Sequence, residues 1–159
     1  MKKIRIATAA AAALCLLLTA CGTAAEPELS AAPVISEETN TEEITMKLLI
    51  NGTEVPVTWE QNDSVAALRE LAGGEGLEIS MSMYGGFEQV GSLGQRLPRD
   101  DRQTTTEAGD IVLYSGDQIV VFYGSNSWAY TRLGHVGLSR AEMTELLANG
   151  SVTLRITEG

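Results

Sequence analysis

Turn signals that recur at short intervals constrain the fold of this chain more than any other feature. Through most of its length, short runs of branched, aromatic and other apolar residues alternate with turns that contain glycine or asparagine. Asn51-Gly52 separates the β-prone runs 46–50 and 54–59, and Asn-Gly between such runs is a strong hairpin signal. Pro56 predicts an edge position for the second run, since proline has no N–H to donate to a neighbouring strand. The pattern therefore predicts a mainly β domain that contains antiparallel hairpins.

Alternation of apolar and polar residues predicts two longer strands with one buried face each. Residues 77–83 alternate in this way, with Met83 as the last inward position, and residues 151–157 alternate likewise. Residues 94–108 are polar and contain Pro98, so they are predicted to form a long loop. The other expected strands are residues 87–93, 111–114, 118–123 and 128–133.

Two short helices are predicted from their start and stop signals. The first lies between capping residues at 62–64 and a glycine stop at 73–74. The second begins at Ser139, with Glu142 three residues later as in a capping box, and ends at 149–150. The sum is about seven or eight strands and two helices, and the economical arrangement is a small closed β-barrel with the helices over its open ends.

The first twenty residues have the pattern of an export signal. Lys2, Lys3 and Arg5 precede an apolar run over 6–18. That run is shorter than the roughly 20 residues that a spanning helix needs, and it is typical of a secretory signal peptide. Residues 1–20 are therefore predicted to be a signal peptide that is removed from the mature protein.

The end of the apolar run, Leu18-Thr19-Ala20-Cys21, closely resembles the bacterial lipobox. The resemblance implies cleavage just before Cys21 and a diacylglyceryl thioether on its sulfur. Two acyl chains anchor a protein stably, so the protein is expected on the extracytoplasmic side of a cell membrane, with the lipid bilayer as a partner. The alternative is an ordinary secretory signal with an incidental cysteine. Cys15 would be lost with the signal, so neither reading leaves a disulfide.

Charge separates a linker from a folded domain. Residues 22–45 carry six glutamates, no lysine or arginine and almost no large apolar residues, so 21–45 is predicted to be a disordered acidic linker. Residues 46–159 hold all eight aromatic residues and are predicted to be the folded domain. The formal charge of this domain is −7, which argues against nucleic acid as a partner because nucleic acid is bound by basic patches.

Two segments of the domain resemble the bacterial cyclophilin-like domain family. They are 108–123, which contains Gly-Asp-Ile-Val-Leu-Tyr, and 130–135, Tyr-Thr-Arg-Leu-Gly-His. A hairpin followed by a helix at the start, and a helix followed by a strand at the end, fit the same family. The resemblance extends over essentially all of 46–159 and implies a small closed barrel of the cyclophilin-like fold.

The family resemblance does not by itself imply an activity. Cyclophilins isomerise Xaa–Pro bonds in an apolar pocket for the proline ring, with a cation, usually arginine, near the amide. These enzymes carry a Phe-His-Arg strand motif and a Gln-Gly-Gly-Asp-Phe turn, and this chain has neither. Its segment 81–87, Met-Ser-Met-Tyr-Gly-Gly-Phe, has glycines and an aromatic residue without a preceding arginine.

Aromatic residues suggest a binding groove. Five of the eight lie close together, at Tyr114, Phe122, Tyr123, Trp128 and Tyr130. Alternation along a strand places some of them in the core, Phe122 first among these, and leaves others to line a groove. Trp128 is the best groove candidate because it adjoins a loop.

The candidate ligand-binding residues are Trp128, Tyr130, Arg132, Gln118, Met83, Phe87 and His135. Arg132 is also a candidate for a catalytic role, as a cation beside the two aromatic residues, and its alternative is a strand arginine paired with a carboxylate. Met83 and Phe87 form either the floor of an apolar pocket or part of the core. Gln118 offers an amide to a peptide backbone, and the alternative for His135 is a loop or cap residue.

No metal site or cofactor is expected. After removal of the predicted signal peptide, the chain would have one histidine, a single cysteine that is expected to be acylated, and scattered acidic residues, which is a poor ligand set. The glycines at 73–76 follow a helix instead of opening one, so they are not a phosphate loop. The expected function is a non-catalytic module for an extended peptide or a small molecule. The alternatives are a divergent prolyl isomerase acting on exported proteins, which needs Arg132 or an arginine at 96, 99 or 102, and a structural lipoprotein that docks a partner.

Overall fold

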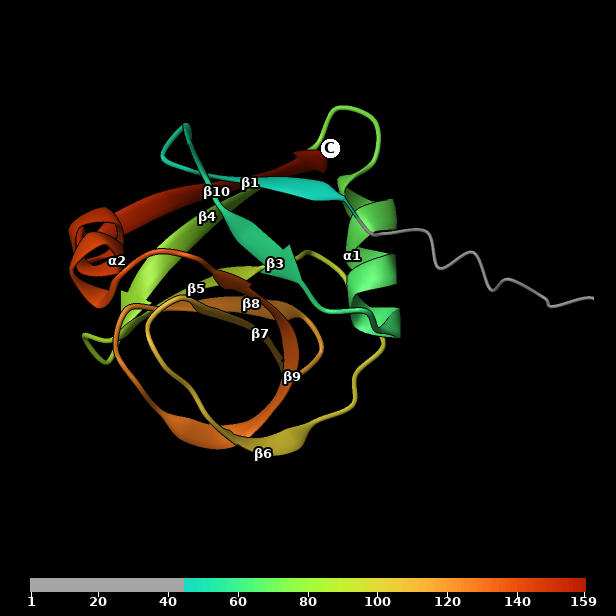
Figure 1. Cartoon of the computed structure of the whole chain (residues 1–159). Helices are drawn as coiled ribbons and strands as arrows, with labels where there is room; N and C mark the ends of the chain where they lie inside the picture. Colours follow the sequence, from blue (N-terminus) through green and yellow to red (C-terminus); the bar gives the residue numbers. More distant parts are fainter. Residues whose placement is uncertain (1–44) are drawn as a thin grey trace, which may run out of the picture. The chain divides into compact units, whose positions relative to one another are not determined.

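The computed structural model describes residues 45–159 and shows a mainly β domain with two helices (Figure 1). The strands are β1 (Met46–Ile50), β2 (Thr53–Val55), β3 (Val57–Trp59), β4 (Leu77–Tyr84), β5 (Glu88–Ser92), β6 (Arg102–Thr105), β7 (Asp110–Tyr114), β8 (Gln118–Phe122), β9 (Ser127–Val136) and β10 (Ser151–Glu158). The helices are α1 (Asp63–Ala72) and α2 (Arg140–Leu147). The predicted signal peptide, Cys21 and almost all of the predicted linker lie outside the described residues.

The strands form one antiparallel sheet that closes on itself almost completely. Its order is β2-β1-β10-β4-β5-β8-β7-β9-β3, and β6 pairs with β9 outside this path. β2 and β3 are consecutive parts of one extended stretch, interrupted only by Pro56, so the two ends of the order meet in the chain itself. The prediction of a small barrel with two short helices is confirmed.

Pro56 lies where this stretch changes partner, between β2 and β3, which are the two end strands of the sheet order, so the predicted edge position is confirmed. The residues before it pair with β1, and the residues after it pair with β9. The carbonyl of Pro56 accepts a hydrogen bond from the Gly137 amide at 2.8 Å. A residue without an N–H fits this point because the ladder needs no donor where the strand leaves one neighbour for another.

Two tight hairpin turns contain residues in the left-handed backbone conformation. Asn51 and Gly52 have φ of 50° and 81°, which is the left-handed pair that a tight β1–β2 turn requires. Ser115 and Gly116, between β7 and β8, have φ of 54° and 84°. Glycine and asparagine adopt this conformation at low cost, so the turn residues set the register of the strands on either side.

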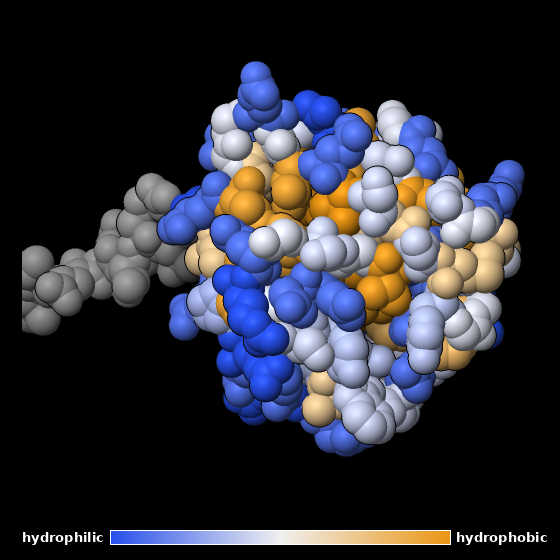
Figure 2. Space-filling model, turned by 180° about the vertical axis from the view of Figure 1, so that it is seen from behind, coloured by the Kyte–Doolittle hydropathy of each residue, from blue (hydrophilic) through white to orange (hydrophobic). Residues whose placement is uncertain are grey.

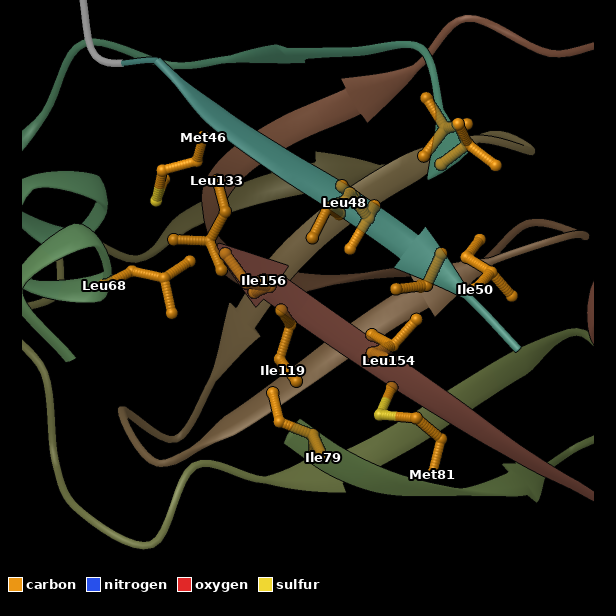
Figure 3. Close-up of a cluster of buried hydrophobic side chains, with 14 of the residues drawn as sticks. Met46, Leu48, Ile50, Leu68, Ile79, Met81, Ile119, Leu133, Leu154 and Ile156 are labelled. Atoms are coloured by element: carbon orange, nitrogen blue, oxygen red, sulfur yellow. The ribbon is translucent and has the colours of Figure 1, made fainter. Parts of the chain in front are cut away.

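The main core lies inside the barrel, where alternate residues of the strands meet. Val152, Leu154 and Ile156 of β10 are buried, as are Ile79 and Met81 of β4. Figure 3 shows labelled side chains of β1, β4, β8, β9, β10 and α1 converging in this core. The period-two pattern of β4 and β10 therefore predicted the correct inward faces.

Met83 is an exception to this alternation. It has the parity of Met81, but 41% of its surface is exposed. Pairing between β10 and β4 ends at Ser151 and Ser82, so Met83 lies beyond the end of the β10 ladder. Nothing in the alternation reveals where a neighbouring strand stops.

The two helices lie on opposite sides of the barrel in Figure 1, and each buries apolar side chains in the core. Asn62 caps α1, since its Oδ1 accepts a hydrogen bond from the Val65 amide at 2.9 Å. Ser139 and Glu142 form the expected capping box of α2. Within the described part of the chain, neither helix has the length and hydropathy to cross a membrane.

Strand β6 was not expected, because its residues fall in the segment 94–108 that was predicted to be a loop. The strand pairs with β9, from Arg102 opposite Tyr130 to Thr105 opposite Ser127. Its side chains are mostly exposed. A strand without a buried face shows no alternation, so its composition resembles that of a loop.

Candidate functional site

The sheet buries a second, smaller cluster on the face opposite the main core. Along β8, Ile119 and Val121 belong to the main core, whereas Val120 and Phe122 belong to the second cluster. Val112 of β7 and Tyr130 of β9 complete its buried set, with two partly buried residues packed against it, Phe87 and Val90. Both faces of β7 and β8 are therefore covered by protein, which is uncommon for an antiparallel sheet.

The first part of β9 provides the cover for this second face. The β7–β9 pairing ends at Leu113 and Thr131, and the register shifts between Ile111 and Val112. Beyond Thr131, toward Ser127, β9 pairs with β6 instead of β7. Figure 1 shows this part of β9 and β6 set apart from β7 and β8. Because this part of β9 leaves β7, a space remains between it and the β7–β8 pair.

That space is a pocket of about 410 Å³, here called the aromatic pocket. Its lining residues come from β4, β5, β7, β8 and β9 and from the turn before β9. They are Tyr84, Glu88, Val90, Tyr114, Gln118, Val120, Asn126, Trp128 and Tyr130. Tyr130 is buried, and its ring lies 6.0 Å from that of Tyr114, edge to face. Trp128 and Tyr84 are the most exposed members, at 57% and 67%.

Glu88 gives the aromatic pocket its distinctive electrostatics. Only 6% of this residue is exposed, and its Oε2 has no hydrogen-bond partner. Burial raises the pKa of the Glu88 carboxyl from 4.5 to about 7. Burial also raises the pKa of Tyr130, and the nearby Glu88 charge adds to that shift. Among the described residues that line the pocket, none is lysine, arginine or histidine.

The β5 ladder explains why this carboxyl is surrounded by rings. Glu88 pairs in register with Phe122 of β8 on one side and with Tyr84 of β4 on the other. Alternation places Glu88 and Val90 on the pocket face, and it places Gln89 on the other face, where its Nε2 donates to the Leu147 carbonyl at 2.7 Å. The sequence did not identify Glu88 as a site residue, because a polar residue on the outer face of a sheet is normally solvated and carries no signal of function.

The structure brings three of the predicted ligand-binding residues together and separates the others. Gln118, Trp128 and Tyr130 all line the aromatic pocket. Phe87 lies outside its lining, with its ring stacked 6.5 Å from that of Phe122. Met83 is exposed outside the pocket. Tyr84 and Tyr114 join the pocket through strand register, which no local sequence signal carries.

Arg132 and His135 lie elsewhere, on a shared carboxylate. The Asp110 side chain is almost fully buried, and its Oδ1 lies 2.7 Å from Arg132 Nη2 and 3.0 Å from His135 Nδ1. Its Oδ2 accepts a hydrogen bond from the Glu107 amide at 2.9 Å. Arg132 Nε also lies 3.6 Å from Glu60 Oε1. Arg132 thus has the geometry of the alternative interpretation, a strand arginine paired with carboxylates.

Glu107, Asp110 and His135 are the described residues that could hold a metal ion. One ligand atom from each lies within 4.8 Å of the other two. Both oxygens of Asp110 already accept protein hydrogen bonds, and one of these is from the Arg132 guanidinium. A cation at this site would have to compete with that guanidinium, so the geometry is that of an internal ion pair.

A second hollow, here called the charged groove, lies between the start of α1, the loop before β6, and β9. Its volume is about 380 Å³, and its lining includes Arg99, Arg102, Arg132, Glu60, Asp63 and Asp100. The Arg102 Nη2 lies 2.7 Å from Asp100 Oδ2, and the Arg99 Nε lies 3.5 Å from Asp101 Oδ2. The arginines of this groove are thus partnered within the protein. Figure 2 shows the domain from behind, where hydrophilic residues surround an apolar area.

Comparisons with known proteins agree with this architecture. Residues 48–157 match the model of the cyclophilin-like family. No curated protein matches in sequence. The fold is similar to the solution structure of a hypothetical protein from Archaeoglobus fulgidus, with a TM-score of 0.52 and 12% sequence identity, over 74% of this chain and 95% of that one. Because the family match spans most of the chain, the chain belongs to the cyclophilin-like family.

Proposed function

We propose that this chain is a membrane-anchored extracytoplasmic protein whose cyclophilin-like domain binds an extended peptide or a small molecule in the aromatic pocket without catalysing a reaction. One observation carries the proposal. The large apolar side chains exposed in the described domain are Met83, Tyr84, Tyr114 and Trp128, and three of these four line the same pocket. Exposed aromatic residues gathered around a concave site are typical of recognition surfaces.

The size and composition of the pocket support a modest ligand. A volume of about 410 Å³ lies within the range of small-molecule sites. Trp128 and Tyr84, the most exposed rings of the pocket, offer large, rigid contact areas with little entropy to lose on binding. Gln118, half-buried at the pocket wall, has a side-chain amide suited to a peptide backbone. These features suit an apolar segment with a few polar contacts.

Tryptophan fluorescence of the full chain in a neutral detergent tests this proposal. Trp59 is buried and donates to the Met46 carbonyl at 2.9 Å, whereas Trp128 is exposed at the pocket, so a ligand-induced change reports on Trp128. The probe is a blocked Ala-Ala-Pro-Phe peptide. We expect a saturable change in wild type and at least tenfold weaker binding by Trp128→Ala. Arg102→Ala, in the charged groove, is the control and should bind as wild type does. No saturable binding to a folded protein would count against the proposal.

A divergent prolyl isomerase is the second candidate, because the family resemblance leads to it. It requires an arginine beside the bound amide. The four candidates each lie within 4.0 Å of a carboxylate oxygen, and none lines the aromatic pocket; they are Arg96, Arg99, Arg102 and Arg132. This arrangement supports the binding role over the catalytic one.

A protease-coupled proline isomerisation assay separates the two candidates. We expect no acceleration above the uncatalysed rate from wild type. Acceleration that disappears in Arg132→Ala would establish the isomerase and place its site in the charged groove.

The membrane anchor is tested at the two cysteines of the N-terminal segment. Labelling with a fatty-acid analogue in a bacterial host should modify wild type and Cys15→Ser but not Cys21→Ser. Cys15→Ser is the matched control because it makes the same chemical change within the predicted apolar run. An unlabelled wild-type protein would indicate the ordinary secretory signal.

A further inference from the structure

Resting on the proposed binding role of the aromatic pocket, we propose that its ligand is an organic cation, a primary or secondary ammonium group on an apolar body. Glu88 would hold the ammonium group, and the surrounding rings would hold the rest of the ligand.

The Glu88 carboxyl lacks a hydrogen-bond partner at one of its oxygens. Glu88 is more than nine-tenths buried and lines the pocket, yet its Oε2 receives no hydrogen bond from the protein. A buried polar atom without a partner is unfavourable, and a ligand that supplies an N–H donor removes that cost. A charged donor suits a carboxylate best, because charge-assisted hydrogen bonds are about twice as strong as neutral ones.

Four aromatic rings line the pocket together with the Glu88 carboxyl. Tyr84, Tyr114, Trp128 and Tyr130 all contribute to the lining. The faces of such rings carry negative potential and attract ammonium groups, most strongly for tryptophan. The buried ring of Phe122 packs against Tyr130, with the two ring centroids 5.8 Å apart. Rings around a carboxylate form a site that favours a cation over an anion or a neutral group of the same size.

The charged and titratable groups around Glu88 also favour a cation. The titratable groups that line the pocket beside Glu88 are phenols, namely Tyr84 of β4, Tyr114 of β7 and Tyr130 of β9. Tyr123, directly after β8, belongs to the main core, and burial and then the nearby Glu88 charge raise its pKa. No lysine, arginine or histidine within the described residues lines the pocket, so no internal cation competes for the carboxylate. The domain's formal charge of −7 also attracts cations at low ionic strength.

Protonation of Glu88 makes this binding depend on pH. Its pKa is about 7, so the carboxyl is largely neutral at pH 6 and largely ionised at pH 8. A cation binds the ionised form, and its affinity should fall about tenfold between pH 8 and pH 6. Tyr130 and Tyr123 stay neutral in this range, because burial raises the pKa of both.

Benzylammonium and benzyl alcohol form a matched pair of probes, since they differ in charge and share a ring. Binding to the full chain in a neutral detergent is followed by Trp128 fluorescence and calorimetry at pH 8 and pH 6. We expect benzylammonium to bind at least tenfold more tightly than the alcohol at pH 8 and to lose about tenfold at pH 6. Glu88→Gln should make the two probes equal. Glu78→Gln, an exposed glutamate of β4, should leave the preference unchanged.

The outcomes separate this inference from the proposed function. Equal affinity for the two probes in wild type at pH 8, or a preference that ignores pH, overturns the cation assignment. Neither result requires the Glu88→Gln variant to fold. The blocked proline peptide would still bind in a Trp128-dependent way if only the inference fails. Loss of that peptide binding would overturn the proposed function itself.

Discussion

The aromatic pocket and the charged groove are nearly equal in volume, about 410 and 380 Å³, and opposite in chemistry. In the charged groove, Arg102 and Arg132 lie within ion-pair distance of two other lining residues, Asp100 and Glu60 respectively. The aromatic pocket holds a single carboxyl, Glu88, whose Oε2 has no partner. A buried polar group that the protein leaves unsatisfied marks a ligand site more clearly than a large number of charges does.

Burial alone does not mark a site, as Asp110 shows. Its side chain is as deeply buried as that of Glu88, yet both of its oxygens accept hydrogen bonds from Arg132, His135 or the Glu107 amide. Its bonds tie β9 to the start of β7. The comparison between Asp110 and Glu88 therefore separates a structural carboxyl from a binding carboxyl.

The largest expected effect is on stability, through Glu88→Gln. The folded-state pKa of Glu88 is raised from 4.5 to about 7, so folding favours the protonated form. The stabilising state is fully present below pH 4.5 and is lost as pH rises through 7. At pH 9, the glutamine variant should therefore be more stable by up to about 3 kcal/mol, and at pH 5 by less than about 1 kcal/mol. Urea unfolding at both values measures the difference, with Glu78→Gln as the control. An equal difference at both pH values would falsify the assignment of a buried, neutral carboxyl.

Asp110→Asn should show the opposite behaviour. The change removes a fully partnered buried carboxylate, and the free energy of unfolding should fall by about 2 kcal/mol. Peptide and cation binding in the aromatic pocket should remain within twofold of wild type, because Asp110 does not line it. Urea unfolding and fluorescence titration of the same sample check both statements. A stable variant that no longer binds would instead move the ligand site to the Asp110 cluster.

Gln118→Ala sharpens the distinction between two kinds of ligand. The amide of Gln118 suits a peptide backbone, so the blocked proline peptide should bind about fivefold more weakly, or about 1 kcal/mol. Benzylammonium, which has no backbone, should bind unchanged. Parallel titrations give both numbers, and an equal loss for the two ligands would show that Gln118 acts on the shape of the pocket.

Arg99→Ala should have the smallest effect. Its pair with Asp101 is partly exposed, and such pairs contribute less than about 1 kcal/mol. The free energy of unfolding should fall by no more than that, and binding of both ligands should stay the same. A tenfold loss of peptide affinity in this variant would show that the charged groove takes part in recognition.

Much of the fold could be predicted because its signals are local. Asn51-Gly52 adopts the backbone that the β1–β2 turn needs, and Ser139 with Glu142 caps α2 as expected. Strand β6 could not be predicted because its exposed residues lack a buried face. The exposure of Met83 could not be predicted either, since it depends on where β10 stops pairing with β4.

The candidate site was predictable only in part. Trp128, Tyr130 and Gln118 are conspicuous in the sequence as residue types near a loop, and the structure places them in one pocket. Glu88 is one of many glutamates and gains its character from the rings of β4, β7 and β9 that surround it. Arg132 is conspicuous as well, but its partner Asp110 lies on a different strand, and only the β7–β9 pairing brings the two together.

The sequence by itself determined the mainly β class and the two capped helices, because these depend on neighbouring residues and their periodicity. The resemblance of 108–123 and 130–135 to the cyclophilin-like family, confirmed by the match over 48–157, added the family of the barrel. The sequence also carries the signal-peptide and lipobox pattern on which the proposed anchor rests. Only the tertiary structure decided which residues share a pocket and which charges find partners. The physical reason is that strands far apart in the chain provide the partner of a carboxyl and set the dielectric around it. No local sequence pattern specifies which of these strands lie side by side.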